Sequence, residues 1–308
     1  DVAVAIESLV GMALVMWAVK RIAAVLQISA VPVAALVVGL VCLVMFVVRC
    51  AKSESPLLDV RLFRNKAFSA GIIAALGSMF AAAALLFLLA QWLQLVDGCG
   101  PMESGVKLLP LAVGSLVSGA LAPAAAMRFG TRRVLVTGLG IAAFAMLMLL
   151  PFGGDLTYIP VAIASGLVGV GSGVLAVGSS VIMCATPPEK ASSAAAFEEI
   201  AYDLGNVLGV AILGSAASIV YRMGFDVSAL MEAGLDAASV DAAMQSFGAC
   251  TSIAADSGVT ALLTQGMASF TDSIVLTSAI GGVIMIVVTI VVFKLVPKHF
   301  DITEDSYE

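Results

Sequence analysis

Residues 67–96 read AFSAGIIAALGSMFAAAALLFLLAQWLQLV, a run of 30 residues without a charged side chain. A membrane-spanning helix needs about 20 mostly apolar residues, so this run is long enough to cross a bilayer once. Its apolar side chains do not alternate with polar ones, as they do in the strands of a membrane β-barrel. A helix satisfies its backbone hydrogen bonds within the segment itself. The run therefore predicts a transmembrane α-helix.

The rest of the chain repeats this pattern. Five further uncharged runs are long enough to span a membrane, and two more qualify although they contain acids. The uncharged runs are 22–48, 108–127, 134–154, 156–188 and 273–293, and the other two are 2–19, which contains Glu7, and about 192–221. We therefore expect an all-α polytopic membrane protein with eight transmembrane helices.

The composition excludes two other classes of protein. The 308 residues are 61% hydrophobic and 12% charged, with a mean hydropathy of +1.11. Soluble domains are about 45–50% apolar and about 25% charged, so a soluble domain is excluded. The formal net charge is −6 and the pI is near 4.8, which leaves no basic surface for a nucleic acid. We expect no nucleic-acid partner.

The basic residues are distributed unevenly between the two sides of the membrane. If the first helix runs outward, eleven of the fifteen Lys and Arg residues fall in inner connections and four in outer ones. This predicts that both ends of the chain lie in the cytoplasm. Asp1 leads almost directly into a span without a Met or a signal peptide, so we expect the chain to be cut at this point. Because the topology places Asp1 inside, any spans that precede it should be even in number.

The same topology divides the chain into parts. We expect a two-helix hairpin (1–48), a cytoplasmic linker (49–67), a six-helix bundle (68–294) with an outer loop (223–271), and a cytoplasmic tail (295–308).

No motif for enzyme chemistry occurs in the sequence. Walker-type loops, HExxH, GxSxG and nucleotide-binding glycine motifs are absent, and the only histidine, His299, falls in the tail. We expect no enzymatic activity, no metal site and no cofactor. Two of the five cysteines, Cys99 and Cys250, fall on the outer side, where they are either unpaired small residues or a disulfide.

Three acidic residues, Glu198, Glu199 and Asp203, lie inside one predicted span, where each costs about 2.5–3.5 kcal/mol. Glu199 and Asp203 share a helix face that Asn206 continues, and Glu198 projects beside Tyr202. Desolvation and mutual repulsion favour protonation of such carboxyls. We therefore expect the three acids to carry protons and bind a lipophilic cation in competition, with Tyr202 and Asn206 lining the cavity. Alternatively, Glu198 and Glu199 lie close enough to inner water to be ordinary solvated charges.

An arginine-rich turn joins two spans on the inner side. It contains Arg128, Gly130, Arg132 and Arg133. The arginines either satisfy the positive-inside rule and do nothing more, or brace helix ends and carboxylates in an inward-closed state. In the second case the turn acts as a gating loop that opens when those contacts break.

Two further features concern the packing of the spans. Gln91 and Trp92 are expected either to line a cavity or to form an interfacial belt. Small residues recur at helix-packing spacing and let backbones approach closely, either as static packing or as a seam where helices rock. The pairs are Gly114 with Ser118, Gly169 with Gly173, and Gly205 with Gly209.

Three stretches resemble the fourteen-span drug:proton antiporters of the major facilitator superfamily. Residues 56–68 (PLLDVRLFRNKAF) and 89–95 (LAQWLQL) look like the central linker and the ninth span of that family. Residues 128–133 look like a degenerate copy of the superfamily's inner-loop signature. Residues 194–209 (AAAFEEIAYDLGNVLG) resemble the thirteenth span of the quaternary-ammonium-compound pumps, including its acidic pair. The resemblance covers essentially the whole chain, as the last eight of fourteen spans.

The resemblance implies an exporter of lipophilic or quaternary ammonium cations that is driven by the proton motive force without a cofactor. Its partners would be such cations, protons, membrane lipids and six N-terminal spans outside this sequence, because alternating access needs two bundles around one site. Residues 108–127 contain no acid, unlike the corresponding span of some pumps of this type. Two alternatives stay open: an exporter of an endogenous lipid or metabolite, and a non-transporting membrane subunit that needs a partner.

Overall fold

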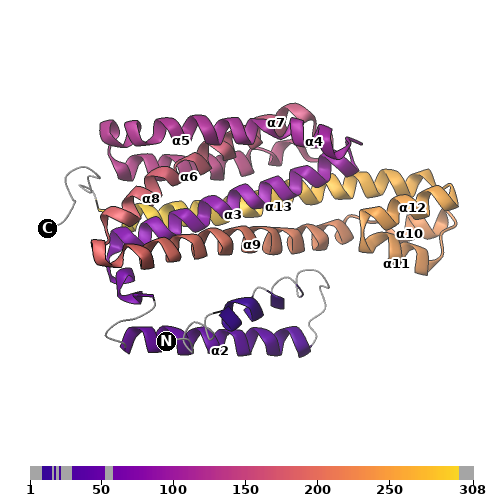
Figure 1. The fold of residues 1–308 in the computed structure, drawn as a ribbon. Coiled ribbons are helices and arrows are strands. Elements are labelled where there is room, and N and C mark those ends of the chain that lie inside the picture. Colours follow the sequence, from indigo (N-terminus) through magenta and orange to yellow (C-terminus); the bar gives the residue numbers. More distant parts are fainter. Residues whose placement is uncertain (1–8, 16, 19–20, 22–29, 53–57, 298–308) are drawn as a thin grey trace.

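The described part of the chain consists of helices and connecting turns (Figure 1). The structure is a computed structural model and describes residues 9–15, 17–18, 21, 30–52 and 58–297. Half of the predicted first span, 2–19, lies outside the described residues, as do Glu7 and His299. The expected all-α membrane fold is confirmed, whereas the number of spans is not.

The main helices run side by side along one direction (Figure 1). Their bounds are α3 (Lys66–Leu95), α4 (Pro101–Lys107), α5 (Leu109–Phe129), α6 (Thr131–Leu147), α7 (Tyr158–Gly173), α8 (Leu175–Cys184), α9 (Ala191–Met223) and α13 (Thr260–Leu295). In the described part of the chain, five segments are long and apolar enough to cross a membrane. They are α3, α4 with α5, α7 with α8, α9 with the preceding turn η3 (Pro188–Lys190), and α13.

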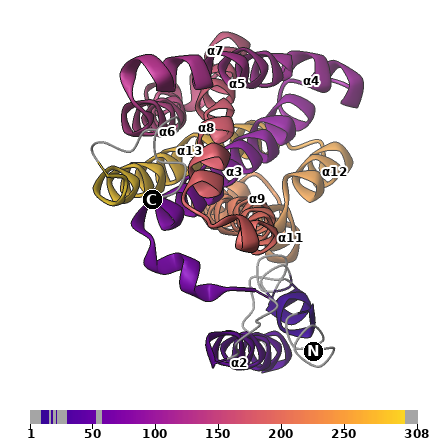
Figure 2. The ribbon, with the colours of Figure 1, turned by 60° about the vertical axis from the view of Figure 1, so that its left-hand side comes forward.

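Helix α3 lies at the centre of the bundle. It packs against α9, α13, α8 and α7, and large side chains along it, such as Phe68, Leu88 and Leu93, are fully buried. Helix α5 packs on α7, and α6 packs on both α7 and α13. Figure 2 shows α5, α6 and α7 on one side of α3 and α9 on the other.

The predicted pairs of small residues lie where helix backbones meet. A Cβ atom added to Gly169 would lie 2.1 Å from the Leu111 carbonyl oxygen of α5, and one added to Gly205 would lie 2.4 Å from the Leu76 carbonyl oxygen of α3. The Ser118 hydroxyl donates to the Val170 carbonyl oxygen at 2.7 Å across the α5–α7 contact. Close backbone approach at these positions is confirmed, so glycine is required there by space.

Helix α2 (Ala30–Lys52) lies beside the bundle and reaches it through the short helix η1 (Val60–Arg64). Phe46 of α2 packs against Leu58 and Val60. The ring of Phe63 in η1 then meets the rings of Phe68 in α3 and Phe197 in α9 edge-on, with centroids 5.3 and 5.0 Å away.

Polar contacts fix the end of the linker to the start of α9. Lys190, immediately before α9, pairs with Asp59 at 2.7 Å, and the Asp59 backbone N–H donates to the Ser193 hydroxyl at 3.4 Å. The Asn65 side chain caps α3 and donates to the Ala185 carbonyl oxygen at 3.1 Å. The hydrogen bond from Lys190 holds the pKa of the buried Asp59 carboxyl below its usual value. The linker and the α8–α9 turn therefore form one connected unit.

Replacing Asp59 by asparagine is expected to destabilise the protein at neutral pH by about 1 kcal/mol or less, since the Lys190 partner is partly exposed. A carboxyl with a lowered pKa stabilises the fold above its unfolded pKa of about 3.9. That stabilisation is lost as the pH falls through the lowered folded value. Thermal midpoints of the wild type and Asp59→Asn should differ at pH 7, and the difference should shrink as the pH falls below about 4 and vanish below the lowered pKa of Asp59. Glu189→Gln, which changes an exposed neighbouring acid, is the control. A difference in thermal midpoint between the wild type and Asp59→Asn that persists in acid would contradict a stabilising role of the ionised Asp59 carboxyl.

The segment predicted as the outer loop, 223–271, is largely helical. It contains α10 (Val227–Glu232), α11 (Ala237–Gln245) and α12 (Phe247–Ser257), and α13 begins at Thr260, before the loop was expected to end. The Tyr221 hydroxyl donates to the Ala243 carbonyl oxygen at 3.2 Å, which fastens α11 to α9. Cys250 is a free, buried thiol in α12, and Cys99 is also free, so the structure favours unpaired cysteines over a disulfide.

Candidate functional site

Helix α9 carries the predicted acidic cluster in one uninterrupted stretch. Gly205 and Gly209 press one side of α9 against α3, where added Cβ atoms would meet the carbonyl oxygens of Leu76 and Phe80. This close packing decides which side of α9 is buried. The acids divide between the two sides.

Glu198 lies on the buried side of α9. Its side chain is largely covered, with 6% of the residue exposed, and its Oε1 accepts a hydrogen bond from the half-buried Tyr202 hydroxyl. Ala194 and Ala201, one turn before and after it, belong to an apolar cluster with Phe68 of α3. The structure thus brings Glu198 and Tyr202 together, in a mostly apolar setting.

Glu199 and Asp203 lie on the exposed side of α9, together with Asn206. Their spacing of four and then three residues places the three side chains on one helix face. In the described residues, no Lys, Arg or His comes within 4 Å of the carboxylates of Glu198, Glu199 or Asp203 as an ion-pair partner. The exposed face therefore presents two uncompensated negative charges when both acids are ionised.

The residues at the other end of α3 do not join this cluster. Trp92 is 3% exposed, and its indole N–H donates to the Thr271 hydroxyl at 3.3 Å in the contact between α3 and α13. This corrects the expectation that Trp92 lines a cavity or belongs to an interfacial belt, because α13 extends far enough to cover it. Gln91 is half-buried.

The arginine-rich turn between α5 and α6 is also separate from the acids. Gly130 ends α5 with φ +90°, a left-handed conformation that favours glycine. The guanidinium of Arg132 lies 4.0 Å from the centroid of the Phe293 ring, and that of Arg128 lies 5.5 Å from the Phe129 ring. Among the described residues, none of Arg128, Arg132 and Arg133 forms an ion pair with a carboxylate. The expected bracing of carboxylates by the turn is therefore not seen.

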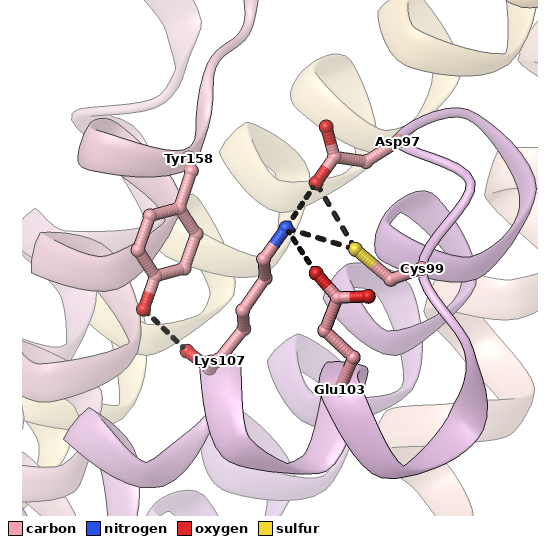
Figure 3. A network of polar contacts seen from close by, with 5 residues as sticks. All are labelled: Asp97, Cys99, Glu103, Lys107 and Tyr158. Carbon is pink, nitrogen blue, oxygen red and sulfur yellow. Dashed lines mark hydrogen bonds and ion pairs between the residues drawn. The ribbon is translucent and has the colours of Figure 1, made fainter.

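A polar network that the sequence motifs do not predict links α3, α4 and α7 (Figure 3). Lys107 Nζ pairs with Asp97 at 2.8 Å and Glu103 at 3.3 Å, and donates to the Cys99 thiol at 2.9 Å. The Tyr158 hydroxyl donates to the Lys107 carbonyl oxygen at 3.1 Å. The hydrogen bond from Lys107 lowers the pKa of the Asp97 carboxyl. The only sequence signal is the i, i+4 spacing of Glu103 and Lys107.

The described residues hold no group of three or more His, Cys, Asp or Glu side chains that could bind a metal ion.

No family model matches the chain. The multidrug efflux pump LfrA of Mycolicibacterium smegmatis is 36% identical over 90% of this chain and 55% of its own length. The methyl viologen resistance protein SmvA of Salmonella typhimurium is 31% identical over 71% of this chain and 44% of its own. A tetracenomycin C resistance and export protein of Streptomyces glaucescens is 29% identical over 55% of this chain and 32% of its own.

The fold has a solved counterpart as well. A bacterial homologue of the human lysosomal transporter Spinster, in an inward-facing and occupied conformation, superposes with a TM-score of 0.56 at 18% identity, over 90% of this chain and 58% of that one. The chain belongs to the major facilitator superfamily. It is a multi-pass membrane protein, and its relatives are transporters rather than enzymes. The chain spans about half the length of the relatives LfrA and SmvA.

One sequence signal distinguishes the buried acid of this major facilitator chain from its exposed neighbours. Glu198 precedes Gly205 by seven residues and Gly209 by eleven, so all three lie on one side of a helix. The glycines mark the side that packs against another helix, and Glu198 is buried with them. Glu199 and Asp203 do not lie on the side of α9 that holds Glu198, Gly205 and Gly209, and they are exposed.

Proposed function

We propose that this chain forms part of a proton-driven exporter of lipophilic cations in a bacterial cytoplasmic membrane. The observation that carries the proposal is the exposed face of α9, where Glu199 and Asp203 lie without a basic partner among the described residues. Relatives of the chain are named as a multidrug efflux pump and a methyl viologen resistance protein, and methyl viologen is a quaternary dication.

In this mechanism a proton and an organic cation compete for the same carboxylates. When ionised, Glu199 and Asp203 attract an organic cation whose charge is not shielded by tightly held water. When protonated, they lose that attraction and release the cation. A site that cannot hold both occupants exchanges one for the other, so proton entry drives cation exit.

Glu198 has a different role in this proposal. Its carboxyl is buried and accepts a hydrogen bond from the Tyr202 hydroxyl. Tyr202 lies one turn further along α9, beside the exposed acids. We assign Glu198 as the proton-coupling group. The hydrogen bond from Tyr202 would couple the ionisation of Glu198 to the exposed face. Asn206 supplies a neutral polar contact at the end of that face.

The rest of the exporter would supply the other wall of the cavity. The relatives are about twice as long as this chain, and alternating access needs two bundles that close on a shared site. The exposed face of α9 would form one wall, with six further spans opposite. The proton motive force would be the energy source, with no cofactor.

The test uses the full-length protein in liposomes with an imposed pH gradient. We expect ethidium efflux by the wild type and loss of most of the gradient-driven rate in Glu199→Gln with Asp203→Asn. Glu189→Gln, an exposed acid before α9, is the matched control and should transport normally. Full efflux by the double variant would contradict the proposal. Equal transport of cationic and neutral substrates would favour the lipid or metabolite exporter.

A further inference from the structure

The arginine-rich turn borders a cavity at one end of the bundle. The cavity has a volume of about 670 Å³ and lies between the start of α6 and the end of α13. Its lining includes Phe129, Arg132, Arg133, Val136, Thr137 and Phe293. Two guanidinium groups and two aromatic rings therefore border one opening at the end of the spans.

An apolar groove continues from this cavity along the helices. It has a volume of about 520 Å³ and lies between α5, α6 and α7, where Leu121, Ala125 and Val170 line it. Phe129, Arg133 and Thr137 border both spaces, so the charged opening adjoins the groove. The groove is almost entirely apolar apart from its charged end.

The charged end lacks a negative partner. The Arg132 Nε atom is buried and has no hydrogen-bond partner, while its guanidinium lies over the Phe293 ring. Arg133 is exposed, and neither arginine pairs with a carboxylate among the described residues. Helix α6 begins at Thr131 after Gly130, which supplies no side-chain cap, so its first N–H groups are also available to an anion. Guanidinium groups bind phosphate with paired hydrogen bonds.

We infer that this surface binds an anionic phospholipid. The phosphate lies between Arg132, Arg133 and the start of α6, and one acyl chain lies in the groove between α5, α6 and α7. An occupant must carry an anion at one end and an apolar chain at the other, because Phe129 and Arg133 border both spaces. Basic pockets between membrane helices recognise anionic lipid headgroups in this way.

The lipid site is distinct from the proposed cation site. Figure 2 shows α5 and α6 on the opposite side of α3 from α9, which carries Glu199 and Asp203. The arginines would repel a cationic substrate, whereas the surrounding bilayer supplies a phospholipid at the membrane surface where the spans end. The site therefore does not depend on the proposed transport function.

The test compares two lipids on the purified full chain in detergent. Dioleoyl phosphatidylglycerol and dioleoyl phosphatidylcholine are titrated separately, and bound lipid is counted by native mass spectrometry. We expect tighter binding of phosphatidylglycerol, and a loss of about fivefold in its affinity for each of Arg132→Gln and Arg133→Gln. Arg64→Gln, an exposed arginine of η1, removes the same charge and should leave the affinity unchanged.

A second variant tests the groove separately. Ala125→Trp fills the groove without changing the charge and should weaken binding of phosphatidylglycerol while leaving the protein monodisperse. Equal binding of the two lipids, or unchanged phosphatidylglycerol binding in both Arg132→Gln and Arg133→Gln, would overturn the inference. It would also be overturned if inorganic phosphate competed fully at concentrations similar to the lipid, since the site would then take a free anion.

Discussion

Replacing Gly205 by alanine is expected to destabilise the bundle by about 1–3 kcal/mol, although alanine is the better helix former. The added methyl group would lie 2.4 Å from the Leu76 carbonyl oxygen and 3.1 Å from the Phe80 backbone nitrogen. Backbone atoms of α3 cannot rotate away as a side chain can, so α9 has to move. In a helix interior, alanine is favoured over glycine by about 1 kcal/mol, so the steric cost has to exceed that gain.

Gly140→Ala is the matched control for this prediction. Gly140 lies inside α6, and a Cβ atom added there meets nothing within 4 Å. We expect the control to be as stable as the wild type or slightly more stable. Thermal unfolding in detergent measures the stability of both variants. If Gly205→Ala and Gly140→Ala had the same thermal midpoint, the α3–α9 contact would be looser than described.

Replacing Glu198 by glutamine is expected to abolish proton-driven efflux in the full-length protein while leaving the fold intact. Glutamine has nearly the same shape and still accepts the hydrogen bond from Tyr202, but it does not take up a proton. Efflux of ethidium under a pH gradient should fall to the level of protein-free liposomes. Thermal stability should change little, because glutamine keeps the volume and the hydrogen-bond acceptor of Glu198.

Tyr202→Phe separates coupling from structure in the same assay. It removes the hydroxyl that donates to Glu198 but keeps the acid, so efflux should be reduced rather than lost. Gradient-driven efflux by Glu198→Gln at the wild-type rate would remove Glu198 from the coupling mechanism. The exposed acids Glu199 and Asp203 would then have to carry the proton alone.

The sequence predicts the helices well because membrane spans are defined by local composition. The run 67–96 becomes α3 at 66–95, with Asn65 supplying the cap. The close helix contacts are also predictable, because small residues at a spacing of four mark them, as Gly205 and Gly209 do. Glu7 and half of the first predicted span stay untested, since they lie outside the described residues.

The features that the sequence does not predict depend on contacts between distant segments. Trp92 donates a hydrogen bond to Thr271 of α13, a residue far along the chain that the fold brings next to it. Arg132 stacks on Phe293 for the same kind of reason. Composition at a helix end indicates an interfacial residue, whereas the fold determines whether another helix covers it.

We propose that the acids of α9 exchange protons for a lipophilic cation. The most direct measurement is the number of protons released when tetraphenylphosphonium binds to the purified full-length protein in weakly buffered solution. We predict release of about one proton per bound cation, since linkage requires each ligand to displace the other. The Glu199→Gln, Asp203→Asn double variant should release fewer. Cation binding without proton release by the wild type would contradict the account.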